Sequence, residues 1–176
     1  MTLSARTRMT VACALIAVCT AASGSAQQTT SYVGTADDFM EISQLFSRYN
    51  YTIDNGDGPA WADNFTPDGV FRDPSWCAIG RDKLITVVGR DAQVGKDLDH
   101  FHFHSLGPIE YLDENHAQIH STVVVMRQAG FGKTGGVSVT GTYDDKLTRV
   151  NGRWKFAYRF VKRLSAEPPI PCPAAE

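Results

Sequence analysis

The segment from Ala36 to Asp54 limits the possible folds most, because its apolar residues recur with the period of an α-helix. They form one stripe along that helix, made of Phe39, Ile42, Leu45, Phe46, Tyr49 and Ile53. Asp54 ends the stripe, directly before the turn-forming residues 55–58. An acid on the apolar edge of a helix needs a partner or a function, since a buried unpaired charge is costly. The pattern predicts that Tyr49 and Asp54, about a turn and a half apart, lean toward one cavity.

The remaining elements are shorter and change in kind along the chain. Two further helices are predicted, at Pro59–Phe65 and from Gly80 to Val88, with a strand over Val70–Asp73 between them. From His100 onward the pattern predicts strands, at His100–Leu112, Ala117–Gln128, Val137–Val150 and Arg153–Leu164. The last two form a hairpin around Asn151-Gly152, a strong turn signal. This order indicates an α+β fold, in which a curved antiparallel sheet wraps around the long N-terminal helix and encloses an apolar pocket.

The N-terminal region has the pattern of a secretory signal. Arg6 and Arg8 precede an apolar run from Met9 to Ala22, and small residues follow up to Ala26. We therefore expect residues 1–26 to be a signal peptide and the protein to be secreted or periplasmic. The rest divides into a loose leader (27–34), one domain (35–165) and a Pro-rich tail (166–176).

Two cysteines remain outside the predicted signal, Cys77 and Cys172. In an oxidising compartment an isolated pair is a candidate for a disulfide, which would hold the tail against the domain. Two free buried thiols are the alternative.

The charge balance restricts the class of partner. The formal net charge of the whole chain is −2, and the chain has no basic cluster of the kind that binds nucleic acid or an anionic membrane. The apolar run near the N-terminus is too short to cross a bilayer comfortably. We expect a small hydrophobic substrate as the ligand, with no nucleic acid and no membrane as partner.

Several motifs, in their order and spacing, resemble the SnoaL-like branch of the NTF2-like superfamily. They are Arg-Tyr-Asn-x-x-Ile-Asp-x-Gly-Asp at 48–57, Trp-Ala-x-x-Phe-Thr-x-Asp-Gly-Val-Phe at 61–71, Gly-x-Tyr-x-Asp at 141–145, and Gly-Arg-Trp-Lys-Phe at 152–156. That branch includes scytalone dehydratase, bile acid 7α-dehydratase and hexachlorocyclohexane dehydrochlorinase. The resemblance implies a cone-shaped domain, chemistry without a cofactor, and a homo-oligomer, either a dimer or a trimer.

The resemblance also implies a catalytic pair, Asp54 from the end of the first helix and His102 from the first long strand, with Tyr49 assisting. A carboxylate fixes the tautomer of an imidazole and stabilises the imidazolium once it has taken a proton. Tyr49 would donate a hydrogen bond to the departing oxygen. Such parts suit a dehydratase, that is, a lyase. The residues expected to bind the substrate are Tyr51, Phe71, Asp73, Trp76, His104 and Arg159.

Structural explanations stand beside these roles. Asp54 is also compatible with simply ending the helix, and Tyr49 with being an ordinary core residue. His100, His102 and His104 alternate with Phe101 and Phe103, so the histidines share one face of their strand. Residues four apart on a strand are about 13 Å apart, too far to share an ion, and we expect no metal site. We expect His102 to point inward, His100 to lie near the rim and His104 deeper in the pocket.

Two other functions remain open. Asp73 followed by Pro74 resembles the base of the steroid isomerases, with Tyr49 in the position of their oxyanion donor. That mechanism gives His102 no role, so it ranks second. A non-catalytic binding module, whose cavity carries a ligand or is filled by side chains, is the third hypothesis.

Overall fold

The computed structural model describes residues 32–94, 100–127, 134–164 and 171–172. The predicted signal peptide lies outside these residues, as do most of the leader and most of the Pro-rich tail. None of the described helices combines the length and hydrophobicity that a membrane span requires.

The described residues form an α+β domain, as the sequence predicts. The helices are α1 (Ala36–Asp54), α2 (Gly58–Ala62) and α3 (Arg81–Val94). The strands are β1 (Phe65–Asp73), β2 (Trp76–Ile79), β3 (His100–Ser105), β4 (Ile109–Tyr111), β5 (His116–Arg127), β6 (Gly136–Val150) and β7 (Arg153–Arg163). The sequence predicts one strand over His100–Leu112, whereas the structure divides it into β3 and β4. Strand β2 has no counterpart among the predicted elements.

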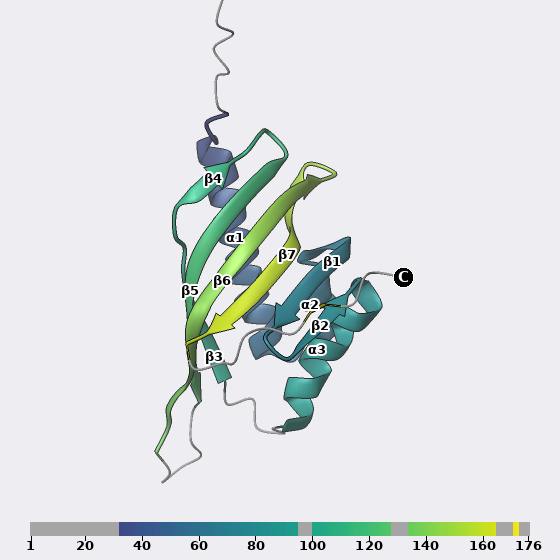
Figure 1. The fold of residues 1–176 in the computed structure, drawn as a ribbon, viewed down its shortest axis with the longest axis vertical. Helices are drawn as coiled ribbons and strands as arrows, with labels where there is room; N and C mark the ends of the chain where they lie inside the picture. Colours follow the sequence, from purple (N-terminus) through teal and green to yellow (C-terminus); the bar gives the residue numbers. More distant parts are fainter. Residues whose placement is uncertain (1–31, 95–99, 128–133, 165–170, 173–176) are drawn as a thin grey trace, which may run out of the picture. The chain divides into compact units, whose positions relative to one another are not determined.

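All seven strands belong to one curved sheet, which lies against α1 (Figure 1). The strand order is β2-β1-β7-β6-β5-β3, and β4 also pairs with β5. The pairings are antiparallel except that of β1 with β7, which is parallel. The sheet is therefore mixed and mostly antiparallel. The parallel pair joins strands far apart in sequence, because parallel neighbours cannot be linked by a short hairpin.

The β6–β7 hairpin turns at Asn151 and Gly152, as predicted. Their φ angles of 51° and 76° lie in the left-handed region. Two consecutive residues of this kind match the twist of the flanking strands, and asparagine and glycine adopt this conformation at the lowest cost.

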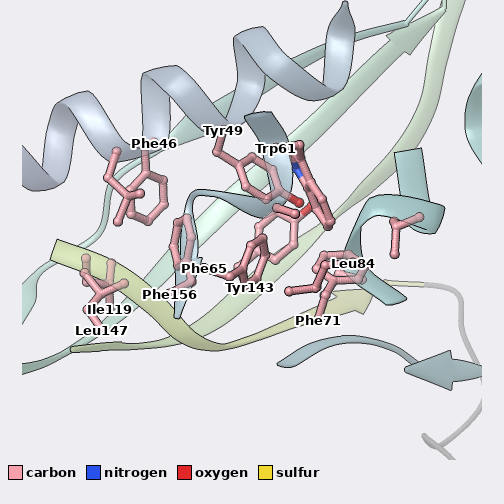
Figure 2. Packing of buried hydrophobic residues seen from close by; sticks show 14 of the residues in the cluster. Phe46, Tyr49, Trp61, Phe65, Phe71, Leu84, Ile119, Tyr143, Leu147 and Phe156 are labelled. Atoms are coloured by element: carbon pink, nitrogen blue, oxygen red, sulfur yellow. The ribbon is translucent and has the colours of Figure 1, made fainter. Parts of the chain in front are cut away.

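The core lies between α1 and the sheet, and it is rich in aromatic rings (Figure 2). Most of the predicted stripe of α1 is buried, since Ile42, Leu45, Phe46 and Tyr49 expose at most 3% of their surface. Phe39 is the exception: the sequence predicts it in the buried stripe, but it lies in the first turn of α1 and is 51% exposed. From the other side, the sheet contributes large buried side chains, including Leu147, Trp154 and Phe156.

A buried network of hydrogen bonds fixes the N-terminal end of α1. The carboxylate of Asp38 accepts hydrogen bonds from the hydroxyl of Tyr32, the backbone N–H of Thr35 and Nε1 of Trp154, and it pairs with Arg149. Thr35 caps the helix in return, so both halves of a capping box are present. Burial alone would raise the pKa of Asp38, but these donors outweigh burial and lower the pKa well below its usual range.

This network predicts that the domain loses stability in acid. The pKa of Asp38 is lower in the folded chain than the usual value of about 3.9. Its ionised carboxylate therefore stabilises the fold fully above about pH 3.9, and this contribution is lost as the pH falls below it. Asp38→Asn should therefore lower the free energy of unfolding at pH 6 by about 1.5–3 kcal/mol, and by less at pH 3. Urea unfolding at both pH values measures this, with the exposed neighbour Asp37→Asn as control. Equal losses at the two pH values would contradict it.

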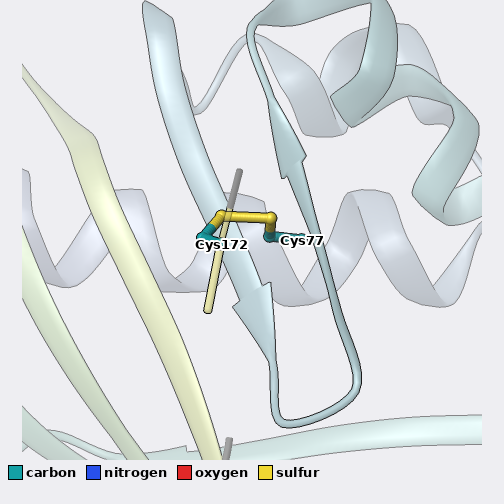
Figure 3. Close-up of a disulfide and its surroundings, with 2 residues drawn as sticks. All are labelled: Cys77 and Cys172. Atoms are coloured by element: carbon teal, nitrogen blue, oxygen red, sulfur yellow. A yellow bond between two sulfur atoms is a disulfide. The ribbon is translucent and has the colours of Figure 1, made fainter. Parts of the chain in front are cut away.

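A disulfide joins Cys77 on the edge strand β2 to Cys172 (Figure 3). The predicted pairing is confirmed, and the alternative of two free thiols is wrong. The bond ties a residue of the tail to the strand at the end of the sheet.

Removal of this disulfide should destabilise the domain, because it closes a long loop in the unfolded chain. The cysteines are 95 residues apart, and a bridge of this kind contributes about 2–4 kcal/mol. The double replacement Cys77→Ser/Cys172→Ser should lower the urea midpoint accordingly. Reductant should shift the wild-type midpoint by the same amount and leave the variant unchanged. An unaltered wild-type midpoint in reductant would refute the stabilising role.

Candidate active site

Asp54 and His102, 48 residues apart in sequence, are in contact where the end of α1 meets β3. Oδ1 of Asp54 lies 2.6 Å from Nδ1 of His102, and the backbone N–H of His102 donates to both carboxylate oxygens at 3.3 and 3.1 Å. The two side chains are only 16% and 14% exposed. Because the carboxylate is the acceptor, a neutral His102 carries its proton on Nδ1, which leaves Nε2 as the nitrogen that can take a proton.

The pair borders a cavity of about 360 Å³. Among the predicted residues, Tyr49, Phe71, Asp73 and Trp76 also line it. Most of the remaining wall is apolar, with side chains that include Ile53, Val87, Val88, Val123, Val125 and Val161. The cavity is near the lower end of the size range of small-molecule sites, which are about 300–1,000 Å³, and its wall combines apolar side chains with several polar and charged ones.

Tyr49 lies at the inner end of this cavity with its side chain fully buried. Within the described part of the chain, its hydroxyl has no well-aligned hydrogen-bond partner, and the hydroxyl of Tyr143 is its neighbour. Burial, followed by the influence of Tyr143, raises the pKa of Tyr49 well above its usual range. The phenol is therefore protonated at ordinary pH, and the hydroxyl of Tyr143 competes with a ligand as the acceptor of its O–H hydrogen bond.

Tyr143 is a wall residue to which the sequence assigns no role. It lies on β6, lines the cavity, and packs edge-on against the ring of Tyr49, with the ring centroids 6.3 Å apart (Figure 2). Burial raises its pKa too. The only sequence signal for Tyr143 was its place in the motif at 141–145, which does not say which way the side chain points.

Asp73 lines the cavity, but other groups hold its carboxylate. Oδ2 is 2.6 Å from Nη2 of Arg163, and Oδ1 accepts hydrogen bonds from the backbone N–H and the hydroxyl of Ser75. Phe71 and Trp76 stand on either side of it along β1 and β2, with their ring centroids 5.5 Å apart. Asp73 therefore acts here as a bound counter-ion of Arg163.

Three of the predicted substrate-binding residues, Tyr51, His104 and Arg159, do not reach the cavity. Tyr51 is 70% exposed, because a side chain two positions from Tyr49 projects from the opposite side of a helix. His104 points inward as predicted but lies beyond the cavity wall, next to the rings of Phe46, Tyr49 and Tyr143. Burial, then Arg159, then His102 lower the pKa of His104 to about 2, so His104 is neutral.

Arg159 does not line the cavity, although it is among the residues expected to bind the substrate, because its side chain is completely buried behind the cavity wall. Its guanidinium carbon lies 3.8 Å from the ring centroid of Tyr143 and 4.1 Å from that of Tyr49. Its Nε is 3.3 Å from Oδ1 of Asp145, a fully buried carboxylate. A substrate in the cavity meets the two tyrosines and not Arg159. Burial raises the pKa of Asp145 to about 7, against the opposing effect of Arg159.

At the rim, His100 lines the cavity as predicted, and it is accompanied by Arg127, which the sequence analysis does not identify. Nε and Nη2 of Arg127 lie 3.2 and 3.1 Å from Nε2 of His100. These residues face each other across the β3–β5 pairing. That register is invisible in the sequence, which explains why Arg127 is missed.

A second histidine–aspartate pair lies on the other face of the sheet. Nδ1 of His120 is 2.6 Å from Oδ1 of Asp144, and both side chains are substantially exposed. Neither residue lines the cavity. Among the described residues, no group of three histidine, cysteine, aspartate or glutamate side chains is arranged to hold a metal ion.

The comparison with protein families identifies a match over most of the described domain. The sequence profile described as a SnoaL-like domain matches residues 34–159. No curated protein matches the chain.

Solved structures with similar folds include proteins with and without a suggested activity. A protein of unknown function from Mycobacterium tuberculosis is 30% identical over 73% of this chain and 77% of that chain, with a TM-score of 0.65. An NTF2-like protein from Novosphingobium aromaticivorans with a cystatin-like fold is 23% identical over 74% and 84%, with a TM-score of 0.63. A candidate scytalone dehydratase from the same organism is 21% identical over 80% and 96%, with a TM-score of 0.62. The last two similarities concern the fold alone.

Proposed function

Since this chain belongs to the SnoaL-like family, we propose that it is a cofactor-independent lyase that removes water from a small hydrophobic substrate. The observation that carries the proposal is the 2.6 Å contact between Asp54 and His102 at the wall of an apolar cavity. The candidate scytalone dehydratase among the structural relatives agrees with this direction.

In the proposed reaction, Nε2 of His102 removes a proton from a carbon next to a carbonyl or an aromatic ring. The electrons of that C–H bond form a double bond, and the C–O bond at the neighbouring carbon breaks. Tyr49 donates a hydrogen bond to the departing oxygen, which leaves as water once it has gained a proton. Asp54 holds the ring of His102 and stabilises the imidazolium. His102 gives the proton that it removed to the departing oxygen, so water leaves and His102 and Tyr49 both return to their starting state.

The cavity suggests the size and polarity of the substrate. A volume of about 360 Å³ suits a molecule of one to a few fused rings better than an extended chain. Phe71 and Trp76 offer aromatic faces to such a ring system. We therefore propose an aromatic or polycyclic substrate that carries a hydroxyl group.

The isomerase alternative receives less support from this geometry. Asp73 lines the cavity, but both of its oxygens are engaged, one by Arg163 and one by Ser75. A base of that mechanism needs a carboxylate that is free to carry a proton between two carbons of the substrate. A non-catalytic binding module differs from the lyase in one outcome, since it would bind the same molecules and leave them unchanged.

We also propose that the protein is exported through residues 1–26 and assembles as a homodimer or homotrimer. The outer face of the sheet supports the second point, because Phe101, Phe103 and Met126 are 46%, 56% and 42% exposed side by side on β3 and β5. Exposed apolar groups of this kind mark contact surfaces. A monomer mass in light scattering would refute the assembly.

The proposed activity can be tested by a screen of hydroxylated aromatics, terpenoids and steroids. The purified protein should convert at least one of them to a product lighter by one water molecule, detected by mass spectrometry and by the absorbance of the new double bond. A product of unchanged mass with a shifted double bond would point to the isomerase instead. Binding without conversion across the panel would favour the binding module.

A further inference from the structure

The rim of the cavity carries two arginines, and their surroundings differ. Arg163 pairs with the buried carboxylate of Asp73 at 2.6 Å, so its charge is compensated. Arg127 has one recorded polar partner within the described residues, the imidazole of His100. A guanidinium only donates hydrogen bonds, so Nε2 of His100 must accept, and this nitrogen carries no proton. Among the residues that the structure describes, the positive charge of Arg127 therefore has no counter-charge at the edge of the cavity.

The contact with His100 also orients the guanidinium. A guanidinium has five N–H groups in one plane, and the contact uses one on Nε and one on Nη2. The N–H groups of Nη1 and the second one of Nη2 are left for another acceptor. A carboxylate matches such a pair of neighbouring donors, since it can accept two parallel hydrogen bonds.

The strand register gives the backbone spacing between His100, which holds Arg127, and the proposed base His102. His100 pairs with Arg127 and His102 pairs with Val125, so the two sites are two residues apart along β3. Two residues of a strand correspond to about 7 Å. Val125, Ser138 and Val139 line the cavity between them, and the Ser138 hydroxyl donates its hydrogen bond to the backbone oxygen of Val125.

We propose that the cavity binds carboxylic acids with an apolar body, whose carboxylate is held by Arg127 at the rim. In combination with the proposed lyase function, on which this part rests, the carbon that loses its proton lies about 7 Å from the carboxylate. That separation is roughly the length of two fused aromatic rings. His100 positions Arg127 and does not touch the reacting atoms.

The test measures binding and does not require turnover. The probes are 2-naphthoate and its uncharged analogue 2-naphthamide, titrated calorimetrically into the purified full chain. The wild type should bind 2-naphthoate more tightly, and added salt should reduce the difference. Arg127→Gln should weaken 2-naphthoate binding by about tenfold, the value of one charge-assisted hydrogen bond, and should leave 2-naphthamide binding unchanged. The control is Arg153→Gln. Arg153 begins β7, does not line the cavity and pairs with Glu41, so this variant should bind both probes like the wild type.

The two proposals can fail separately. Arg127-dependent binding of 2-naphthoate by a protein that dehydrates nothing would retain the carboxylate site and remove the lyase. Turnover of a neutral substrate, with no preference for 2-naphthoate and no effect of Arg127→Gln, would remove the carboxylate site and retain the lyase. Absence of binding by both probes also overturns the carboxylate site.

Discussion

Replacement of His102 by glutamine should lower the turnover of any substrate that the wild type dehydrates by a factor of about 10²–10⁴, the usual contribution of a general base. Glutamine keeps a polar side chain next to Asp54 but has no nitrogen that can accept a proton at neutral pH. The substrate should still bind, because the apolar wall is unchanged. The expected result is a large fall in kcat with a small change in KM, measured by steady-state kinetics on a substrate found in the screen.

The outer face of the sheet provides a matched control for this variant. His120 and Asp144 have the same 2.6 Å contact as His102 and Asp54, but they lie away from the cavity. His120→Gln should therefore leave kcat unchanged. Equal activity of His102→Gln and wild type would remove His102 as the base. Equal losses in both variants, or a shifted urea midpoint of His102→Gln, would assign the effect to folding.

Arg159→Met should lower the free energy of unfolding by about 3–5 kcal/mol, as is usual when one partner of a buried ion pair is removed. The guanidinium and the Asp145 carboxylate expose none of their surface. The variant keeps most of the side-chain volume against the aromatic rings, so it tests the charge rather than the packing. It leaves Asp145 buried without a positive neighbour.

The loss should depend on pH, because Asp145 can relieve its own burial by taking up a proton. Burial already raises the pKa of Asp145 to about 7 in the folded chain, above the usual value of about 3.9. An acid whose pKa is higher in the folded chain than in the unfolded chain stabilises the fold fully below its unfolded-state pKa. That contribution is lost as the pH rises through the folded-state pKa. Loss of Arg159 raises the folded-state pKa further, so the variant should be less impaired at pH 5 than at pH 8.

A double variant separates the ion pair from the rest of the core. Arg159→Met/Asp145→Leu removes both charges and should recover most of the stability at pH 8, since apolar replacement of a buried pair is often neutral. Urea unfolding of the wild type, the single variant and the double variant at pH 5 and pH 8 provides the comparison. No recovery in the double variant would assign the loss to packing against Tyr49 and Tyr143.

The contact between Asp54 and His102 is predicted by the resemblance to the SnoaL-like branch, and the periodicity of the two elements is consistent with it but does not pair the residues. The apolar stripe of α1 fixes the direction of Asp54, and the alternation of histidine and phenylalanine fixes that of His102. Those signals say which face a residue occupies, but not how deep it lies. His104 and Arg159 face inward as the pattern requires, yet the rings of Tyr49 and Tyr143 stand between them and the cavity.

Other parts of the site depend on pairings that a single sequence does not contain. The parallel contact of β1 with β7 determines where Asp73 meets Arg163, and the register of β3 with β5 determines that Arg127 meets His100. Neither pairing has a turn between its strands that would fix the alignment. Asn151-Gly152 provides one for β6 and β7, and that hairpin is predicted correctly.

The buried network around Asp38 and the carboxylate of Asp54 stand at opposite ends of the same helix. Asp54 follows Asp38 by 16 residues along α1, which corresponds to a rod about 24 Å long. By simple leverage, a tilt of about two degrees at the clamped end moves the other end by close to 1 Å, and a misplacement of that size can cost an enzyme about 10²-fold in rate. Selection for catalysis would then act on Thr35, Asp38 and Arg149, none of which borders the cavity.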